Sequence, residues 1–392
     1  MTRSTAWRLV PALGVTQIVS WGTLYYSIAV LGASMRDELG VSAAWLFGAY
    51  SLALLLSALA APIVGRAIDR HGGRAVMSAG SICAAAALCA IAQVHSTLAL
   101  YLAWAAAGIA MAMTMYDAAF ATLSQHAGTA YRKALTALTL LGGLASTAFW
   151  PASLKGLEWF GWRDTLLIFA ALELAVCLPL HLLFIPRGMA AEPAKAGGVL
   201  DGAGLPAGKR RAAFVWLAMA FALNGFIVSV LTVHLISVLQ GDGLAMNTAV
   251  WVASFFGPMQ VTGRILEFAI GRRFASRSIG LAALGLLVVA VAVLLALRGQ
   301  VALALLFAIL FGGGNGVVTI VRGTVPAELF GRAGYGGTLG KLAAPALFAR
   351  AVAPFAFAPL VATSSATRAG LLLLLAMAVL SVVCFGIAVK RR

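Results

Sequence analysis

The chain of 392 residues is 62% hydrophobic and only 10% charged, and its mean hydropathy is +0.98. A soluble domain of this length needs far more charge to cover its surface, so the composition excludes one and predicts a chain surrounded largely by lipid. The formal net charge of +16 would suit a nucleic-acid-binding protein. Most cations fall in segments that we infer to be cytoplasmic, so we interpret them as a topology signal and a contact surface for anionic membrane lipid, and expect no nucleic-acid partner.

Twelve apolar stretches are each long enough to cross a bilayer as a helix. They cover residues 9–33, 43–64, 75–94, 97–123, 134–156, 163–185, 212–239, 247–270, 279–297, 300–322, 334–360 and 368–389. An even number of crossings, with basic residues before the first and after the last, predicts that both termini are cytoplasmic. We therefore expect an all-α, multi-pass protein of the cytoplasmic (inner) membrane.

The longest polar segment divides these stretches into two sets of six. Residues 186–211 are rich in Ala, Gly and Pro and predict a cytoplasmic linker between a bundle at 1–185 and another at 212–392. A basic segment at 271–277 follows the eighth stretch as another, at 65–74, follows the second. This faint repeat favours two pseudo-symmetric six-helix halves around a central cavity.

The segment at 65–74 reads Gly-Arg-Ala-Ile-Asp-Arg-His-Gly-Gly-Arg. Its three arginines predict a turn at the cytoplasmic membrane surface. The spacing of its glycines, of Asp69-Arg70 and of the last arginine resembles the loop signature between the second and third helices of the major facilitator superfamily. The resemblance implies a secondary transporter that works by alternating access and needs no cofactor. It also implies that Asp69 and Arg70 hold the cytoplasmic gate, with Asp69 accepting hydrogen bonds from helix N-termini.

Charged side chains inside the apolar stretches need a reason, because each costs about 2.5–3.5 kcal/mol at the bilayer centre. Arg264, in the eighth stretch, either reaches the cytoplasmic surface or grips a carboxylate group with two hydrogen bonds. Glu267 is three residues on and is a candidate partner in a structural bridge or a proton-coupled switch. Lys341 and Arg350, nine residues apart in the eleventh stretch, face opposite ways, and we favour Lys341 as the binding residue.

The other polar residues of the apolar stretches have functional and structural interpretations. Arg322 either closes the cytoplasmic gate or caps a helix that Pro326 ends. Asp117, in the fourth stretch, is a proton carrier, a gate partner for a basic residue, or a bond to a neighbouring helix. Glu173, in the sixth stretch, is interpreted as structural. Trp21, Tyr25 and Asn224 are candidates to line the site, although aromatic residues at such spacing also suit helix packing.

A narrower resemblance connects this chain with the monocarboxylate and oxalate/formate branch of the superfamily. It is carried by Trp21-Gly22, by the turn at residues 161–163 and by the arginine of the eighth stretch. The resemblance implies that Arg264 and Lys341 bind an organic anion, and Gln260 stands where that branch may carry an aspartate. We expect a transporter of a small carboxylate-type anion, with proton coupling left open.

Two other functions are less well supported by the sequence. Export of drugs or toxic compounds such as arsenicals is disfavoured because residues 142–151 lack the glycine-proline pair typical of proton-driven exporters in the superfamily. In addition, all four cysteines lie in the third, sixth and twelfth stretches, which the resemblance to the superfamily implies face lipid. A membrane-embedded enzyme would need a nucleophile with a base or a metal cluster, and the five histidines are scattered. We expect neither enzyme activity nor a metal site.

Overall fold

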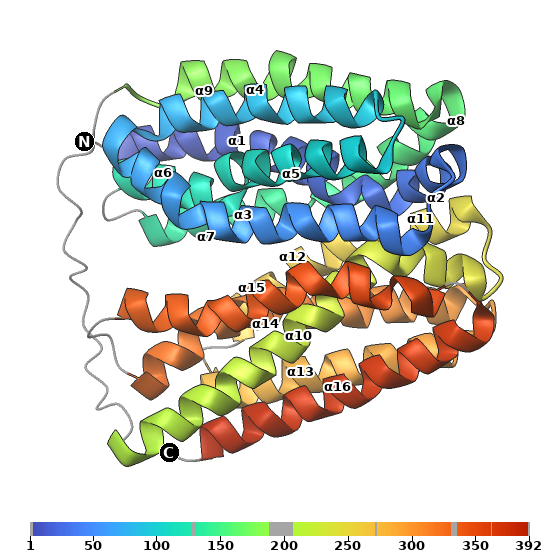
Figure 1. Cartoon of the computed structure of the whole chain (residues 1–392). Helices are drawn as coiled ribbons and strands as arrows, with labels where there is room; N and C mark the ends of the chain where they lie inside the picture. Colours follow the sequence, from blue (N-terminus) through green and yellow to red (C-terminus); the bar gives the residue numbers. More distant parts are fainter. Residues whose placement is uncertain are drawn as a thin grey trace. The chain divides into compact units, whose positions relative to one another are not determined.

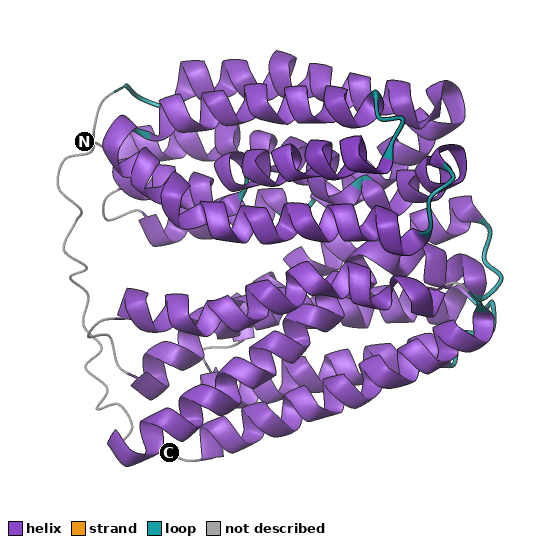
Figure 2. Ribbon diagram, in the orientation of Figure 1, coloured by secondary structure: helices purple, strands orange, loops and turns teal. Residues whose placement is uncertain are grey.

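The computed structural model describes residues 3–127, 131–187, 207–270, 273–330, 335–361 and 363–390. Every regular element in these ranges is helical, so the prediction of an all-α chain is confirmed for them (Figure 2). The chain divides into two compact units, Met1–Gly197, called unit 1, and Gly198–Arg392, called unit 2 (Figure 1). Most of the predicted linker at 186–211 lies outside the described residues.

Ten stretches of the described chain are long and apolar enough to cross a membrane, against twelve in the prediction. The predicted stretches at 134–156 and 163–185 form one run, Ala134–Phe184. A break at Gly161 divides this run, because its φ of 77° belongs to the left-handed region that glycine adopts without strain. The predicted stretch at 247–270 consists of two helices that are each shorter than a membrane span.

Unit 1 is a bundle in which α3 packs along α5, α5 along α4, and α4 along α8. Its elements are α1 (Arg3–Ser20), η1 (Trp21–Tyr26), α2 (Ile28–Leu39), α3 (Ala43–His71), α4 (Gly73–Ala92), α5 (Thr97–Thr114), α6 (Tyr116–Ala127), α7 (Tyr131–Gly142), α8 (Ala145–Leu172), η3 (Glu173–Cys177) and α9 (Leu178–Phe184). Both η1 and η3 are single turns of π-helix inside otherwise α-helical rods. Such turns occur often at functional sites.

The predicted turn at 65–74 is much shorter than expected, because α3 continues through His71 and only Gly72 separates it from α4. Ile68 explains the extension, since its fully buried side chain belongs to an apolar core shared by α1, α3, α4, α6 and α7. Asp69 and Arg70 are exposed on this last turn. The gate residues predicted here therefore lie on a helix end.

The N-terminus of α4 is capped by a residue that the sequence did not single out. The Gln125 side chain, on α6, accepts a hydrogen bond from the backbone N–H of Gly73 (3.4 Å) and donates one to the carbonyl oxygen of Ile68 (3.0 Å). It thus satisfies a free N–H of α4 and ties it to α3. Asp69 is exposed on the last turn of α3, and the hydrogen bonds predicted for it to helix N-termini stay a prediction.

At the other end of unit 1, the two residues after Gly161 form hydrogen bonds to the ends of α2 and α4. Trp162 Nε1 donates to the carboxylate of Glu38 at the end of α2 (2.6 Å), and Arg163 Nε donates to the same carboxylate (2.8 Å). Arg163 also donates to the carbonyl oxygens of Ala92 and Val94, where α4 ends. One arginine therefore joins α2, α4 and α8.

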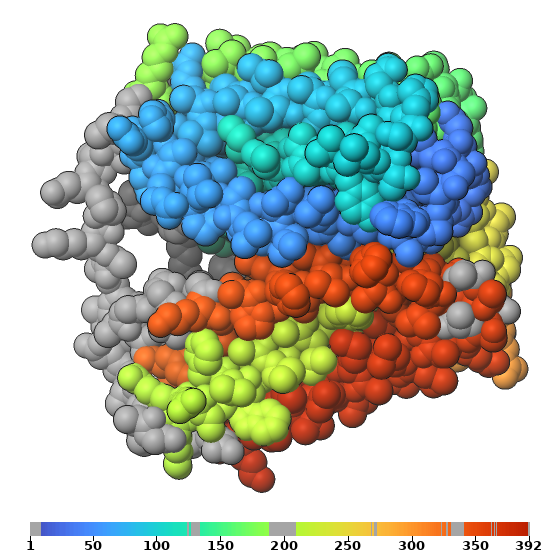
Figure 3. Space-filling model, in the orientation of Figure 1, coloured from blue at the N-terminus to red at the C-terminus, as the bar shows by residue number. Residues whose placement is uncertain are grey.

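Unit 2 is a second bundle. Its elements are α10 (Ala207–Gly241), α11 (Met246–Ser254), α12 (Phe256–Ile270), α13 (Ser276–Leu295), α14 (Val301–Phe330), α15 (Tyr335–Phe357), η5 (Ala358–Val361) and α16 (Ser364–Lys390). The helix α10 packs against both α15 and α16, and Figure 3 shows its yellow-green atoms beside the orange and red atoms of these two helices. The helix α14 packs on α12 and α13.

The prediction that Pro326 ends its helix is wrong, because α14 continues to Phe330. A proline inside a helix loses one backbone hydrogen bond and strains the preceding turn. Burial of Val325, Leu329 and Phe330 on the same helix offsets that cost, and the Phe330 ring also packs 5.9 Å from that of Phe214 on α10. Tertiary packing therefore keeps α14 helical past Pro326.

Candidate functional site

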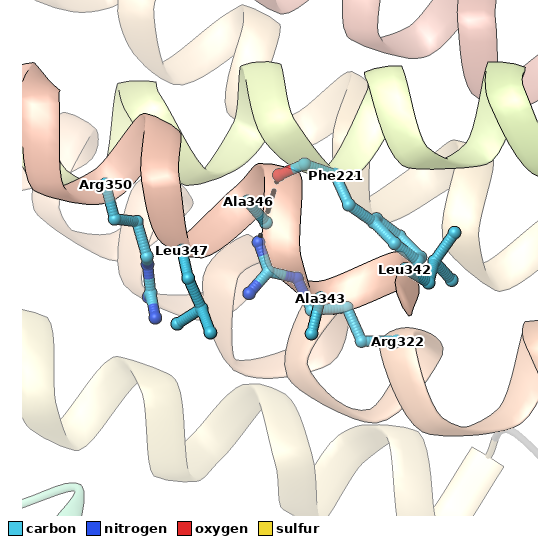
Figure 4. Close-up of a pocket in the computed structure, with 7 residues that line it drawn as sticks. All are labelled: Phe221, Arg322, Leu342, Ala343, Ala346, Leu347 and Arg350. Carbon is cyan, nitrogen blue, oxygen red and sulfur yellow. Dashed lines mark hydrogen bonds between the residues drawn. The ribbon is translucent and has the colours of Figure 1, made fainter. Parts of the chain in front are cut away.

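A cavity of about 80 Å³ lies inside unit 2, between α10, α14 and α15 (Figure 4). Its polar lining consists of two arginines, Arg322 from α14 and Arg350 from α15, and the rest is Phe221 with alanine and leucine side chains of α15. None of the lining residues is acidic. Two guanidinium groups without an acid create a positive potential in a small, apolar-walled space, which suits an anion.

Arg322 is held in a fixed orientation by α10. Its Nη2 donates to the carbonyl oxygen of Phe221 (3.3 Å) and to Oδ1 of Asn224 (3.2 Å), and the guanidinium lies 5.6 Å from the centre of the Phe221 ring. Figure 4 shows this group pointing toward the Phe221 carbonyl. Among the described residues, Arg322 Nε is buried without a hydrogen-bond partner. A donor is therefore left for a ligand.

Arg350 approaches the same cavity from α15. A Cβ atom at Gly225 of α10 would lie only 3.0 Å from the carbonyl oxygen of Ala346 and 3.4 Å from Cγ of Arg350, so glycine there lets α15 lie close to α10. Ser229 of α10 then donates to the carbonyl oxygen of Arg350 (2.8 Å). Within the described part of the chain, Nε of Arg350 is also buried without a hydrogen-bond partner.

A second basic group of unit 2 lies on α12. Arg264 is 8% exposed, and its Nη2 lies 3.5 Å from Oε1 of Gln260, one turn earlier. The helix is held tightly against α14, because a Cβ atom at Gly316 would lie 2.2 Å from the carbonyl oxygen of Gln260. Glu267 is partly buried one turn beyond Arg264.

Lys341, the residue of α15 that the sequence favoured, is exposed, and it is absent from the lining of the cavity. The nine-residue spacing had placed Lys341 and Arg350 on opposite sides of one helix. In the structure, the face of α15 that carries Arg350 lines the cavity.

The predicted site residues of unit 1 belong to an aromatic cluster around the π-turn η1. The Trp21 ring lies 4.9 Å from that of Tyr25 and 5.2 Å from that of Tyr116 on α6, and Tyr25 lies 6.0 Å from Tyr50 on α3. Trp21 is half-buried and Tyr25 is buried. Asp117, next to Tyr116, is exposed in the first turn of α6, where a negative charge is favoured by the helix dipole.

Comparison with known proteins decides the family. Residues 13–340 match the family described as Major Facilitator Superfamily. The chain belongs to this superfamily. It is therefore a multi-pass membrane transporter of a small molecule. A search of curated proteins found no match.

Solved structures share the superfamily fold at low sequence identity. A crystal structure of the nucleoside transporter NupG has a TM-score of 0.73 and 18% identity, and covers 98% of this chain and 99% of its own. A bacterial homologue of the human lysosomal transporter Spinster, in an inward-facing and occupied conformation, has a TM-score of 0.71 and 15% identity, and covers 100% of this chain and 98% of its own. At such identities the likeness shows the fold.

The sequence pointed to some residues of the candidate site and missed others. It named Arg322 and Asn224 separately, and the structure joins them by a hydrogen bond. It passed over Arg350, because the choice between two sides of α15 depends on the packing of α10. Arginine inside an apolar stretch was the available signal, and it applied to Arg350 as much as to Arg322.

Proposed function

We propose that this transporter carries a small organic anion of the carboxylate type across the cytoplasmic membrane by alternating access. The observation that supports the proposal is the cavity of unit 2, where Arg322 and Arg350 line a small space without an acidic residue. A guanidinium group binds a carboxylate through two parallel hydrogen bonds, and desolvated walls strengthen such bonds. The fixed orientation of Arg322 lowers the cost of ordering it around a ligand.

We infer twelve membrane crossings with both termini in the cytoplasm. Dividing the run Ala134–Phe184 at Gly161 turns one of the ten candidate stretches into two. Taking α11 and α12 together as one broken span supplies another. The inferred orientation rests on the basic residues at the end of α3 and on Lys209, Arg210 and Arg211 in the first turns of α10.

The resemblance to the monocarboxylate and oxalate/formate branch supports the same substrate class through Arg264 and Lys341. Arg264 is buried beside Gln260, as a residue that binds a desolvated anion would be. We propose that both basic residues contact the anion during part of the cycle. Trp21 and Tyr25 would line its path in unit 1.

We propose gating roles for the remaining charged residues. Asp69 and Arg70 lie on the exposed end of α3, and Asp117 lies on the exposed first turn of α6. Glu267 lies one turn from Arg264 and is a candidate coupling residue. With protons as coupling ion, its carboxyl group would change charge next to a site for an anion.

Export of an aromatic drug is the second candidate, because Trp21, Tyr25, Tyr116 and their neighbours form a continuous aromatic cluster in unit 1. Export of an arsenical through a thiol site finds less support. Cys83 and Cys89 are exposed on α4, and no group of three His, Cys, Asp or Glu side chains within the described ranges is arranged to hold a metal.

A thermal-shift titration tests the two candidates. The purified full-length protein is heated with acetate, oxalate, benzoate or cationic aromatic drugs, since a ligand that binds the folded state raises its stability, by about 2.7 kcal/mol at a hundred times Kd. We expect a carboxylate to raise the melting temperature of wild type and of Arg277→Gln, which changes an exposed arginine. Arg322→Gln and Arg350→Gln are expected to lose that rise. A rise with cationic drugs alone, retained in both variants, would overturn the anion proposal.

A further inference from the structure

Unit 1 holds a buried carboxyl group that the proposed anion site does not use. Glu173 begins the π-turn η3 inside the apolar run Ala134–Phe184, and its side chain is 0% exposed. Thr23 of η1 donates a hydrogen bond to Oε1 of Glu173 (3.0 Å), and Ser20 of α1 lies 3.4 Å from Oε2. The carboxyl group therefore ties η3 to the N-terminal rod of the same unit.

Among the side chains that the structure describes, no cation lies beside Glu173 to compensate a negative charge. The elements packed against η3 are α1, α4, α8 and α9, and η1 is joined to it through Thr23. Residues 9–20 of α1 hold no titratable side chain. The titratable side chains described on the other elements are Arg74, Cys83 and Cys89 on α4, Lys155, Glu158, Arg163 and Asp164 on α8, His181 on α9, and Tyr25 and Tyr26 on η1.

The positions of these groups leave Glu173 without a counter-charge. The four charged residues of α8 end at Asp164, about 14 Å from Glu173 along a helix. His181 is two turns away on the other side and is engaged with Ser81 of α4 (3.0 Å). Among the described residues, the thiol of Cys177 is the titratable group in contact with the carboxyl group. A negative charge inside the apolar run would be costly without a cation or water beside it, so the neutral acid is favoured.

The partners of Glu173 suit both of its protonation states. A hydroxyl group donates to a carboxylate and accepts from a carboxylic acid, and it changes role by rotating its hydrogen. Thr23 and Ser20 can therefore follow the gain or loss of a proton without moving their heavy atoms. A purely structural bond between two helices would need no ionisable group at this depth.

We propose that Glu173 is an internal proton-binding site of unit 1, separate from the anion cavity of unit 2. In this conformation the site holds its proton. Release would leave a carboxylate to which Thr23 and Ser20 can still donate, but which also needs water or a cation, so η1 and η3 must separate enough to admit one. Because η1 carries Trp21 and Tyr25, proton release is linked to the aromatic cluster. The connection of this link to anion transport rests on the proposed function, whereas proton binding does not.

Infrared difference spectroscopy of the full-length protein in lipid nanodiscs tests the site without any substrate. A protonated carboxyl group has a carbonyl stretch distinct from that of a carboxylate. We expect such a band at neutral pH in wild type and in Glu158→Gln, which changes a surface acid paired with Lys155. The band should be lost in Glu173→Gln, whose amide keeps an acceptor for Thr23. A band that persists in Glu173→Gln, or no band in wild type, would overturn the proposal.

A second variant keeps the acid and tests its environment. Thr23→Val removes the hydroxyl at nearly constant volume, so the Glu173 band should shift in frequency while keeping its intensity. An unshifted band would place the protonated acid elsewhere and contradict the assignment. Anion binding by thermal shift is expected to survive in Glu173→Gln, with transport losing its pH dependence. If wild type binds no anion in the thermal-shift titration, the proposed function is wrong, but the infrared result for Glu173 still stands.

Discussion

Nη2 of Arg322 on α14 donates a hydrogen bond to Oδ1 of Asn224 on α10, 3.2 Å away. This bond aims a buried guanidinium group at the cavity of unit 2. We predict that Asn224→Ala weakens binding of the carboxylate about tenfold to a hundredfold, because a hydrogen bond to a charged group contributes about 1.5–3 kcal/mol. Titration of the purified variant with the carboxylate that shifts wild type measures the effect.

Thr232→Val is the matched control on the same helix. Thr232 is buried and donates to the carbonyl oxygen of Val228 within α10, and it does not line the cavity. Its substitution should leave the affinity close to that of wild type. Equal affinities for Asn224→Ala and wild type would mean that Arg322 needs no support from α10.

The two basic residues of α15 should differ in their effect on binding. Arg350 lines the cavity, whereas Lys341 is exposed. Since salt and water screen an exposed charge more than a buried one, we predict that Arg350→Gln reduces anion affinity more than Lys341→Gln does. Affinities measured at two salt concentrations separate the cases, because the Lys341 contribution should shrink at high salt. The reverse order would favour the assignment implied by the monocarboxylate and oxalate/formate branch.

Hydropathy predicted where the helices lie but not how each one ends. Apolar length alone marked the stretches, because lipid requires every backbone group to be paired within a helix. Helix ends depended on contacts made far along the chain. Burial of Ile68 carries α3 through a glycine-bounded polar segment, and burial of Leu329 carries α14 past Pro326. Local signals at both positions favoured an earlier end.

The candidate site was predicted as separate residues rather than as an arrangement. The cost of polar groups in lipid singled out Arg322, Asn224 and Arg264 from the sequence. Their partners depend on which helices touch, which no spacing within one helix reveals. The bond between Thr23 and Glu173 joins residues 150 positions apart, and an acid interpreted as structural thereby became a candidate proton site.

Gly316 should be intolerant of any side chain. A Cβ atom there would lie 2.2 Å from the carbonyl oxygen of Gln260, so Gly316→Ala must push α14 away from α12. Overpacking of this kind costs about 1–3 kcal/mol. We predict a lower melting temperature and weaker packing around Arg264, on the same helix as Gln260.

Gly285→Ala is the control, because a Cβ atom at Gly285 of α13 would meet no atom within 4 Å. Alanine is favoured over glycine in a helix by about 0.8–1.0 kcal/mol, so this variant should melt at the same or a higher temperature. Equal destabilisation by both substitutions would mean that α12 and α14 are less closely packed than the structure has them.

Arg163 and its acidic partner should contribute unequally to stability, although they form one ion pair. The Glu38 side chain is 52% exposed and that of Arg163 is 25% exposed, so the pair itself contributes about 0–1 kcal/mol. Arg163 also donates to the carbonyl oxygens of Ala92 and Val94, which Glu38→Gln leaves untouched. We predict that Glu38→Gln lowers the free energy of unfolding by less than about 1 kcal/mol, and Arg163→Ala by about 1–3 kcal/mol. Denaturation of the purified variants in the same detergent measures both. If the two variants were equally stable, the stabilising effect of Arg163 would come from its bond to Glu38 and not from its bonds to the end of α4.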